Sequence, residues 1–279
     1  MSEDLRTIYK GRLLAVKDLP TLPTALQEVS RLLELPNTTT DQVAKVISFD
    51  QVLAAKVLKM VNSPIYGFPG RIGTVKHALV LLGFNVIRGL IISTSVYDDM
   101  NRAMRGLWDH SVGCSLACGE LARALGMKDP EEYAVAGLLH DLGKVVSALQ
   151  LPEAKARVDA VVQEQDLLYI DAEAQVLGFG HDRINSWLAE HWNLPPAIRE
   201  GMAFHHKPMS ARIYPQMACV VHVGNFMARL FEYGSGGDDN VPPLSPHALK
   251  LLGMNQRSLE ALLDTLCEKF ADAGELGLA

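Results

Sequence analysis

The stretch DPEEYAVAGLLHDLGK, residues 129–144, decides the fold class and contains the candidate site. It begins with an aspartate that can cap a helix, a proline suited to the first turn, and two glutamates at the positive end of the helix dipole. These signals predict one helix from residue 129 to about residue 149. Helical spacing of apolar residues also dominates the rest of the chain, so we expect an all-α fold, a multi-helix bundle in two lobes.

Further helices are expected on both sides of this stretch, and loops separate them where glycine and proline gather. The loops comprise residues 66–73 and a flexible segment at 234–243, and a polar junction is expected at 98–107. One predicted helix is capped by Thr39 or Thr40 and carries Val43, Val46 and Ile47, and the next is capped by Asp50 and ends at 62–64. The other predicted helices comprise residues 22–35, 74–83, 85–98, 108–125, 129–149, 152–168, 171–177, 181–193, 196–206, 213–233, 245–252 and 255–273.

Composition excludes several classes of protein. The chain has 279 residues, 32 acidic and 26 basic side chains, and a formal charge of −6, which argues against a DNA-binding protein that neutralises phosphates. Hydrophobic residues make up 48%, so wholesale disorder is excluded. Four cysteines in a chain of this length do not form a disulfide framework.

The most apolar stretch, residues 78–96, is long enough to span a membrane. Asn85 and Arg88 lie in its middle and Gly83 interrupts it, so two successive buried helices explain it better. The N-terminus lacks a basic start followed by an apolar core, so no signal peptide is expected. We therefore predict a soluble, cytoplasmic protein without a membrane segment.

His140 and Asp141 are adjacent within an otherwise apolar helix. A carboxylate in such a place is costly to bury unless it is paired or bound to a cation, and imidazole and carboxylate together suit Mn, Fe, Ni or Zn. Neighbouring helical side chains diverge by about 100°, so the pair could grip one ion or bridge two. Lys144 lies one turn further on, where it could hold a phosphate oxygen or balance Asp141.

Other histidines recur on successive predicted helices, one pattern by which bundles build carboxylate–imidazole metal sites. A lone helical histidine is more often a hydrogen-bonded structural residue, so the joint pattern carries this interpretation. His77, His191 and His247 are assigned structural or surface roles, and Cys114 and Cys118 are assigned to core packing. The candidate metal ligands are His110, His140, Asp141, His181, His205, His206 and His222.

Several motifs, in order, resemble a known family. LHDLGK at 139–144 with His110 upstream, GFGH at 178–181 and HH at 205–206 resemble the HD superfamily of metal-dependent phosphohydrolases, and HHKP at 205–208 also matches the HDOD domain described next. The segments LPTLPTALQEVSRLLELP (19–36), VISFDQVLAAKVLKMVNSPIYG (46–67), TVKHALVLLGFNVIRGLII (74–92) and HWNLPPAI (191–198) resemble the HDOD domain, the HD-related output domain of bacterial signalling proteins. The resemblance implies an HDOD domain at 15–235, with an N-terminal lobe at 15–98 and an HD-like lobe at 99–235, followed by a helical tail at 236–279.

The chain also resembles the HD-GYP phosphodiesterases of cyclic di-GMP at most of the candidate ligands and at Lys144, and it departs from them after His206. The glycine-rich GYP loop is replaced by KPMSARIYP at 207–215, and His222 and Asn225 stand where carboxylates are expected. His222 can still ligate a metal, whereas Asn225 ligates transition metals poorly. Metal binding is therefore favoured over cyclic di-GMP hydrolysis.

These observations lead to two hypotheses from different classes. The preferred one is a regulatory signal-transduction module with one or two divalent transition metal ions, Fe or Mn before Zn or Ni. The alternative is a metal-dependent phosphohydrolase acting on a nucleotide or cyclic dinucleotide, with Asp141 and Lys144 as catalytic residues. The expected partners are a signalling protein or a nucleotide ligand, and a homodimer is compatible with either hypothesis.

Overall fold

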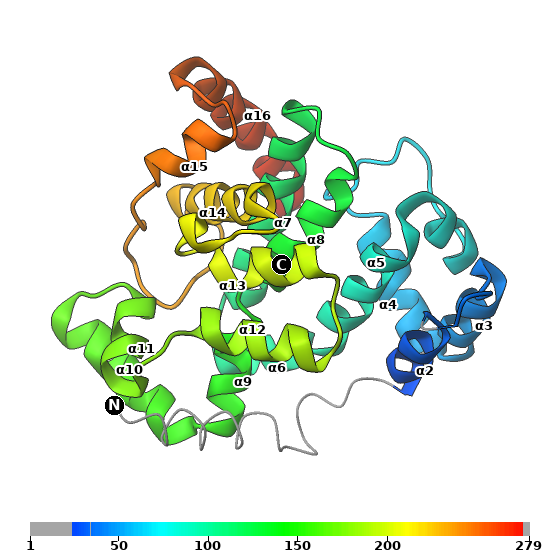
Figure 1. Ribbon diagram of the computed structural model, residues 1–279, viewed down its shortest axis with the longest axis horizontal. Coiled ribbons are helices and arrows are strands. Elements are labelled where there is room, and N and C mark those ends of the chain that lie inside the picture. Colours follow the sequence, from blue (N-terminus) through cyan, green and yellow to red (C-terminus); the bar gives the residue numbers. More distant parts are fainter. Residues whose placement is uncertain (1–23, 34, 276–279) are drawn as a thin grey trace.

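The computed structural model describes residues 24–33 and 35–275, with side chains described as far as residue 271 (Figure 1). Within these residues the regular structure is helical and no strand occurs, so the all-α prediction is confirmed. The helices are α2 (Thr24–Leu33), α3 (Thr40–Phe49), α4 (Gln51–Val61), α5 (Val75–Ser95), α6 (Tyr97–Ala103), α7 (Leu107–Ala124), α8 (Pro130–Leu139), α9 (Leu142–Gln150), α10 (Pro152–Gln165), α11 (Tyr169–Leu177), α12 (His181–His191), α13 (Pro196–Phe204), the 3₁₀ helix η1 (Pro208–Ser210), α14 (Pro215–Leu230), α15 (Pro246–Leu251) and α16 (Gln256–Glu275).

The first four described helices pack together on the right-hand side of Figure 1. α5 is the longest of them, and it bends at Gly83, whose φ of 76° and ψ of 173° are not helical. The predicted interruption near residue 83 is thus a kink within one helix. By length and composition α5 could cross a membrane, but 67% of its most apolar window is buried inside the protein. It is therefore a core helix of the fold.

The second group of helices surrounds α7, which packs against both α8 and α14. Cys114 and Cys118 are fully buried on α7, and the Cys118 thiol approaches the Val220 carbonyl oxygen of α14 at 3.7 Å. The two cysteines therefore lie in the packing of α7 against its neighbours, and neither belongs to the ligand clusters described below. The junction predicted at 98–107 is partly wrong, because residues 97–103 form α6, which packs on α7 and α9.

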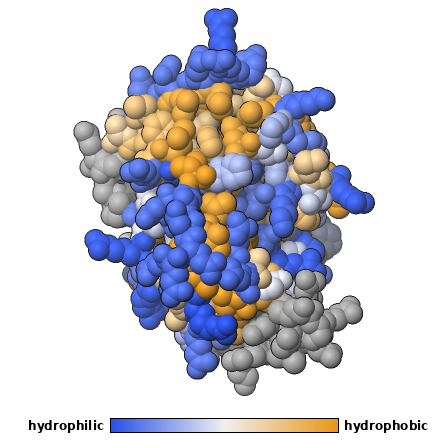
Figure 2. Space-filling view, turned by 90° about the vertical axis from the view of Figure 1, so that its left-hand side faces the viewer, coloured by the Kyte–Doolittle hydropathy of each residue, from blue (hydrophilic) through white to orange (hydrophobic). Residues whose placement is uncertain are grey.

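The two groups meet where α5 packs on α8. The Asn85 amide donates a 2.8 Å hydrogen bond to Glu132, and buried Arg88 donates to the Trp192 carbonyl oxygen. The polar residues that argued against a membrane span therefore connect the two groups of helices. Beyond residue 235, α15 packs on α14 and α16 packs on α7. On the face shown in Figure 2, hydrophobic residues form a band between hydrophilic regions.

Residues 15–23 of the predicted domain lie outside the described residues, so its N-terminal boundary stays a prediction.

Candidate metal centre

The helix predicted at 129–149 is broken at His140 and Asp141, two of the predicted ligands. α8 ends at Leu139, α9 begins at Leu142, and Asp141 has φ −107° and ψ 9°. Asn185 on α12 holds this break, because its amide oxygen accepts from the Gly143 N–H at 2.7 Å and its NH₂ group donates to the His140 carbonyl oxygen. A Cβ on Gly143 would stand 2.3 Å from the His181 carbonyl oxygen, so only glycine permits this close approach.

The Asp141 carboxylate lies at the centre of the site and is 1% exposed. Its Oδ2 atom lies 3.5 Å from His110 Nε2, 3.3 Å from His140 Nε2 and 2.7 Å from Lys144 Nζ. Its Oδ1 atom lies 3.1 Å from His181 Nε2 and 3.9 Å from His205 Nε2. Each oxygen of one carboxylate thus faces a different group of histidines, which is the arrangement of a bridging ligand.

Two clusters of potential ligands result. His110, His140 and Asp141 form the first, which we call the α7–α8 cluster, and His181, His205 and His206 form the second, the α12–α13 cluster. Within each cluster the ligand atoms lie within 4.8 Å of one another. The structure therefore brings six of the seven predicted ligands together, from α7, the α8–α9 break, α12 and the end of α13.

Hydrogen bonds orient three of the rings. Nδ1 of His140 donates to the Gly137 carbonyl oxygen at 2.6 Å, and Nδ1 of His205 donates to the Met202 carbonyl oxygen at 2.9 Å. Because a carbonyl oxygen only accepts, Nδ1 of each ring carries a proton, and Nε2 is the ring nitrogen left to face the site and to ligate a metal. Nδ1 of His181 bonds to Glu173 Oε2 at 2.6 Å, the carboxylate–histidine pairing that accompanies many metal ligands.

Several buried atoms at the centre lack hydrogen-bond partners within the described part of the chain. They are Nε2 of His140, both ring nitrogens of His110, Oδ1 of Asp141 and, beside His181, Oε1 of Glu173. Leaving such atoms unpaired costs about 1–3 kcal/mol each. Burial lowers the pKa of His110, His205 and His206 well below the usual histidine value, which keeps these rings neutral and able to ligate. The donor set therefore fits one or two divalent transition metal ions.

Two buried carboxylates, Asp141 and Glu173, favour binding of a cation at this centre. Burial raises the pKa of Asp141, but His140 and Lys144 outweigh burial and hold that pKa well below its usual value. For His181 the effects run the other way. Burial alone would lower the pKa of this ring, but the Glu173 carboxylate outweighs burial and raises the pKa to about 9. A metal bound at His181 Nε2 would therefore displace a proton from this ring.

Glu173 and Asn185 were missed by the sequence reasoning. Glu173 is fully buried on α11, eight residues before His181, and also accepts from the His181 backbone N–H at 2.8 Å. An acidic residue between two alanines is only a weak signal of such a role. Asn185 lies one helical turn after His181, so a search for polar residues on the ligand face of α12 could have found it.

His222 is the one predicted ligand that the structure does not bring into either cluster. Its Nδ1 donates to the His205 carbonyl oxygen at 2.7 Å, and its Nε2 accepts from the Ser245 backbone N–H at 2.9 Å. Both ring nitrogens are thus used in hydrogen bonds, and His222 belongs to neither cluster. Its role is structural, since it ties the end of α13 and the start of α15 to α14. Neither cluster includes His77, His191 or His247, as expected from the sequence.

The loop at 234–243, which we call the strap, closes the site from outside. Arg229 pairs with Asp238 at 2.6 Å, and the other Asp238 carboxylate oxygen accepts from the Tyr169 N–H at 2.8 Å. The Gly236 carbonyl oxygen accepts from Lys144 Nζ at 2.8 Å, which binds Asp141 as well. The strap is therefore anchored to α9, α11 and α14, and the prediction of a flexible loop did not include these bonds.

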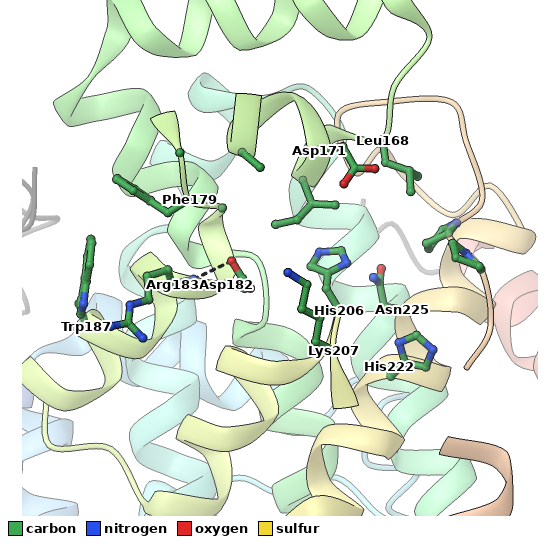
Figure 3. Close-up of a pocket in the computed structure, with 16 residues that line it drawn as sticks. Leu168, Asp171, Phe179, Asp182, Arg183, Trp187, His206, Lys207, His222 and Asn225 are labelled. Atoms are coloured by element: carbon green, nitrogen blue, oxygen red, sulfur yellow. Dashed lines mark hydrogen bonds between the residues drawn. The ribbon is translucent and has the colours of Figure 1, made fainter. Parts of the chain in front are cut away.

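Two cavities adjoin the clusters. The inner one has a volume of about 20 Å³ and reaches His110, Lys144 and His181, which leaves room for about one water molecule. The outer one has about 540 Å³ and opens beside His206 (Figure 3). His206 and Asn225 line both cavities and so stand between them.

The outer cavity is lined by two basic residues, Arg183 and Lys207, and by two acidic ones, Asp171 and Asp182. The side chains of His206, Lys207 and Asn225 gather in its middle, while Phe179, Arg183 and Trp187 lie on one side (Figure 3). The guanidinium of Arg183 lies 5.8 Å from the centre of the Trp187 ring. An aromatic wall beside basic groups can accept an anionic ligand with an apolar part.

Comparisons with known proteins identify the family and the fold. The family model of the HDOD domain matches residues 19–208. A crystal structure of an HDOD domain protein of unknown function from Geobacter sulfurreducens has a TM-score of 0.75 and 26% identity, covering 99% of this chain and 97% of that one. A structure described as that of a candidate phosphohydrolase from Shewanella amazonensis SB2B has a TM-score of 0.68 and 27% identity, covering 92% and 93% of the two chains. An uncharacterized protein of Treponema pallidum (strain Nichols) is 27% identical over 223 residues, and the match covers 78% of this chain but only 43% of that protein.

Proposed function

The chain belongs to the HDOD family, and we propose that it is a regulatory module of a signalling system whose HD lobe holds one or two divalent transition metal ions. The observation that carries the proposal is the position of Asp141 between two clusters of histidines, with unpaired buried nitrogens directed at the centre. Nitrogen and oxygen donors without thiolate favour Fe or Mn, with Zn or Ni as alternatives. His110, His140 and Asp141 would hold one ion, and His181, His205 and His206 the other.

The closed state of the site supports regulation over turnover. Lys144, the residue expected to bind a phosphate oxygen, already bonds both Asp141 and the strap. The inner cavity of about 20 Å³ has no room for a phosphate ester. The chain also lacks the GYP loop after His206, with Lys207 and Pro208 in its place. On this proposal the metal centre sets the conformation of the strap and of α12 and α13. A protein partner or a nucleotide then recognises that conformation. The module works in the cytoplasm, as a single chain or as a homodimer.

The second candidate function is metal-dependent phosphoester hydrolysis. The outer cavity favours it, because about 540 Å³ of space opens beside His206, with Lys207 and Arg183 able to bind an anion. A bound metal would supply an activated water and polarise the phosphoryl group. In this chain, Lys207 and Arg183 would orient the ester and Lys144 would neutralise charge once the strap had moved.

One set of measurements separates the two functions. Metal content is determined for the purified full chain, for His140→Ala and for His191→Ala, an exposed histidine outside both clusters. Hydrolysis of nucleotides, cyclic dinucleotides and bis(p-nitrophenyl) phosphate is then measured with the same preparations. Metal that is lost only in His140→Ala, without turnover, supports the regulatory module. Turnover that Asp141→Ala abolishes would replace it with the hydrolase, and a full chain that takes up no metal would refute both.

A further inference from the structure

A pocket outside the metal centre lies in the N-terminal lobe, between the end of α4 and the loop that leads to α5, on the right-hand side of Figure 1. Its volume is about 740 Å³, larger than the cavity beside His206 and within the range of small-molecule sites. Apolar side chains form part of its wall, and basic groups, glycines and two polar side chains complete it. The lining includes Leu58, Lys59, Ser63, Phe68, Gly70 and Arg71.

The charge of this pocket is opposite to that of the whole protein. Lys59 and Arg71 both line it and both are exposed. Within residues 24–33 and 35–275 neither side chain has an ion pair or a hydrogen bond, whereas Arg31, Arg102 and Arg123 all pair with carboxylates. No acidic residue lines the pocket. Two unpaired cations in a chain of net charge −6 therefore form a local site for an anion.

The glycines of the pocket are not required by the fold. A Cβ placed on Gly70 or Gly73 would meet no heavy atom within 4 Å, and neither residue has a positive φ. Packing and backbone conformation would therefore accept alanine at both positions. Without side chains at these positions, a ligand held by the two cations can approach the main chain closely. The N–H groups of Gly70 and Gly73 could then donate to it, because neither has an acceptor in the described chain.

The loop is held in place without the ligand. The Asn62 side chain donates to the carbonyl oxygens of Leu58 at 2.7 Å and Ile72 at 2.9 Å, and accepts from the Ile72 N–H at 2.7 Å. Asn62 thus preforms the pocket, so that a ligand would not have to order the loop on binding.

We propose that this pocket binds a small organic anion, in which a phosphate or carboxylate group contacts Lys59 and Arg71 and an apolar body lies against Leu58 and Phe68. The proposal is independent of the metal centre, because none of these residues belongs to the HD lobe. A ligand bound here would act on the N-terminal lobe beside α5, the helix that packs on α8 of the HD lobe.

Titration calorimetry of the full chain tests the proposal with two probes, adenosine 5′-monophosphate for the phosphate source and octanoate for the carboxylate source. Lys59→Gln and Arg71→Gln should each weaken the bound probe by about tenfold, because each removes a charge-assisted contact. Gly70→Ala should weaken it as well, while leaving the melting temperature unchanged or slightly higher.

Two matched controls complete the test. Lys56→Gln removes an exposed lysine of α4 that does not line the pocket, and Lys45→Gln removes an exposed lysine of α3 that lines neither this pocket nor the outer cavity. Both should leave the affinity unchanged. Binding that Lys207→Gln, at the outer cavity of the HD lobe, abolishes and Lys59→Gln does not, or the absence of binding for both probes at millimolar concentration, would overturn the proposal.

Discussion

Asp141→Asn tests the electrostatic core of the site, because it removes the charge and keeps the size of the side chain. Asp141 and Lys144 form a 2.7 Å ion pair whose side chains are 1% and 6% exposed. Removing one partner of a buried pair costs about 3–5 kcal/mol, since the other charge stays buried and uncompensated. At about 2–4 °C per kcal/mol, the melting temperature should fall on the order of 10 °C.

The assay is urea and thermal unfolding of both proteins in the presence of a chelator, so that bound metal does not contribute. The double variant Asp141→Asn with Lys144→Met should recover most of the loss, because no unpaired charge remains. Asp171→Asn, at an exposed carboxylate on α11, should stay within about 0.5 kcal/mol of the unaltered chain. A loss below about 1 kcal/mol for Asp141→Asn, typical of surface pairs, would refute the reasoning, and so would a double variant no more stable than the single one.

Three further predictions concern the residues around the ligands. Glu173→Gln should weaken metal binding by about 10–100-fold by loosening His181, measured by competition with a chromophoric chelator; an unchanged affinity would contradict the pairing. His222→Ala should leave metal stoichiometry intact and lower the free energy of unfolding by about 1–3 kcal/mol, whereas loss of metal would return this residue to the ligands. Arg229→Met should accelerate amide hydrogen exchange in the strap, and unchanged protection there would show that the Asp238 pair does not anchor it.

The residues of the two clusters could be identified from the sequence because His140 and Asp141 lie in an otherwise apolar stretch and further histidines recur on successive predicted helices. That recurrence was enough to predict that these side chains converge. The break at His140 and Asp141 could not be predicted, because the local sequence is that of a continuous helix. It depends on Asn185, more than forty residues away, whose side chain takes the place of helical hydrogen bonds.

For His222 the helix could be predicted from the sequence but the role of the side chain could not. Its position on a core helix was predicted correctly, but its role depends on where its ring nitrogens find partners. One partner is a backbone group of Ser245, beyond the strap, and no sequence pattern links the two. The strap itself was predicted as a loop from its glycines and prolines, while its attachment through Asp238 and Gly236 is tertiary.

The most direct test of the central claim is metal analysis by inductively coupled plasma mass spectrometry of the full chain, purified without chelator and compared with Asp141→Ala. The account predicts one or two equivalents of a divalent transition metal per chain, and a loss of most of it in the variant, because Asp141 faces both clusters. A full chain that stays free of metal after incubation with Fe, Mn, Zn or Ni would contradict the account. Equal metal content in the two proteins would contradict it as well.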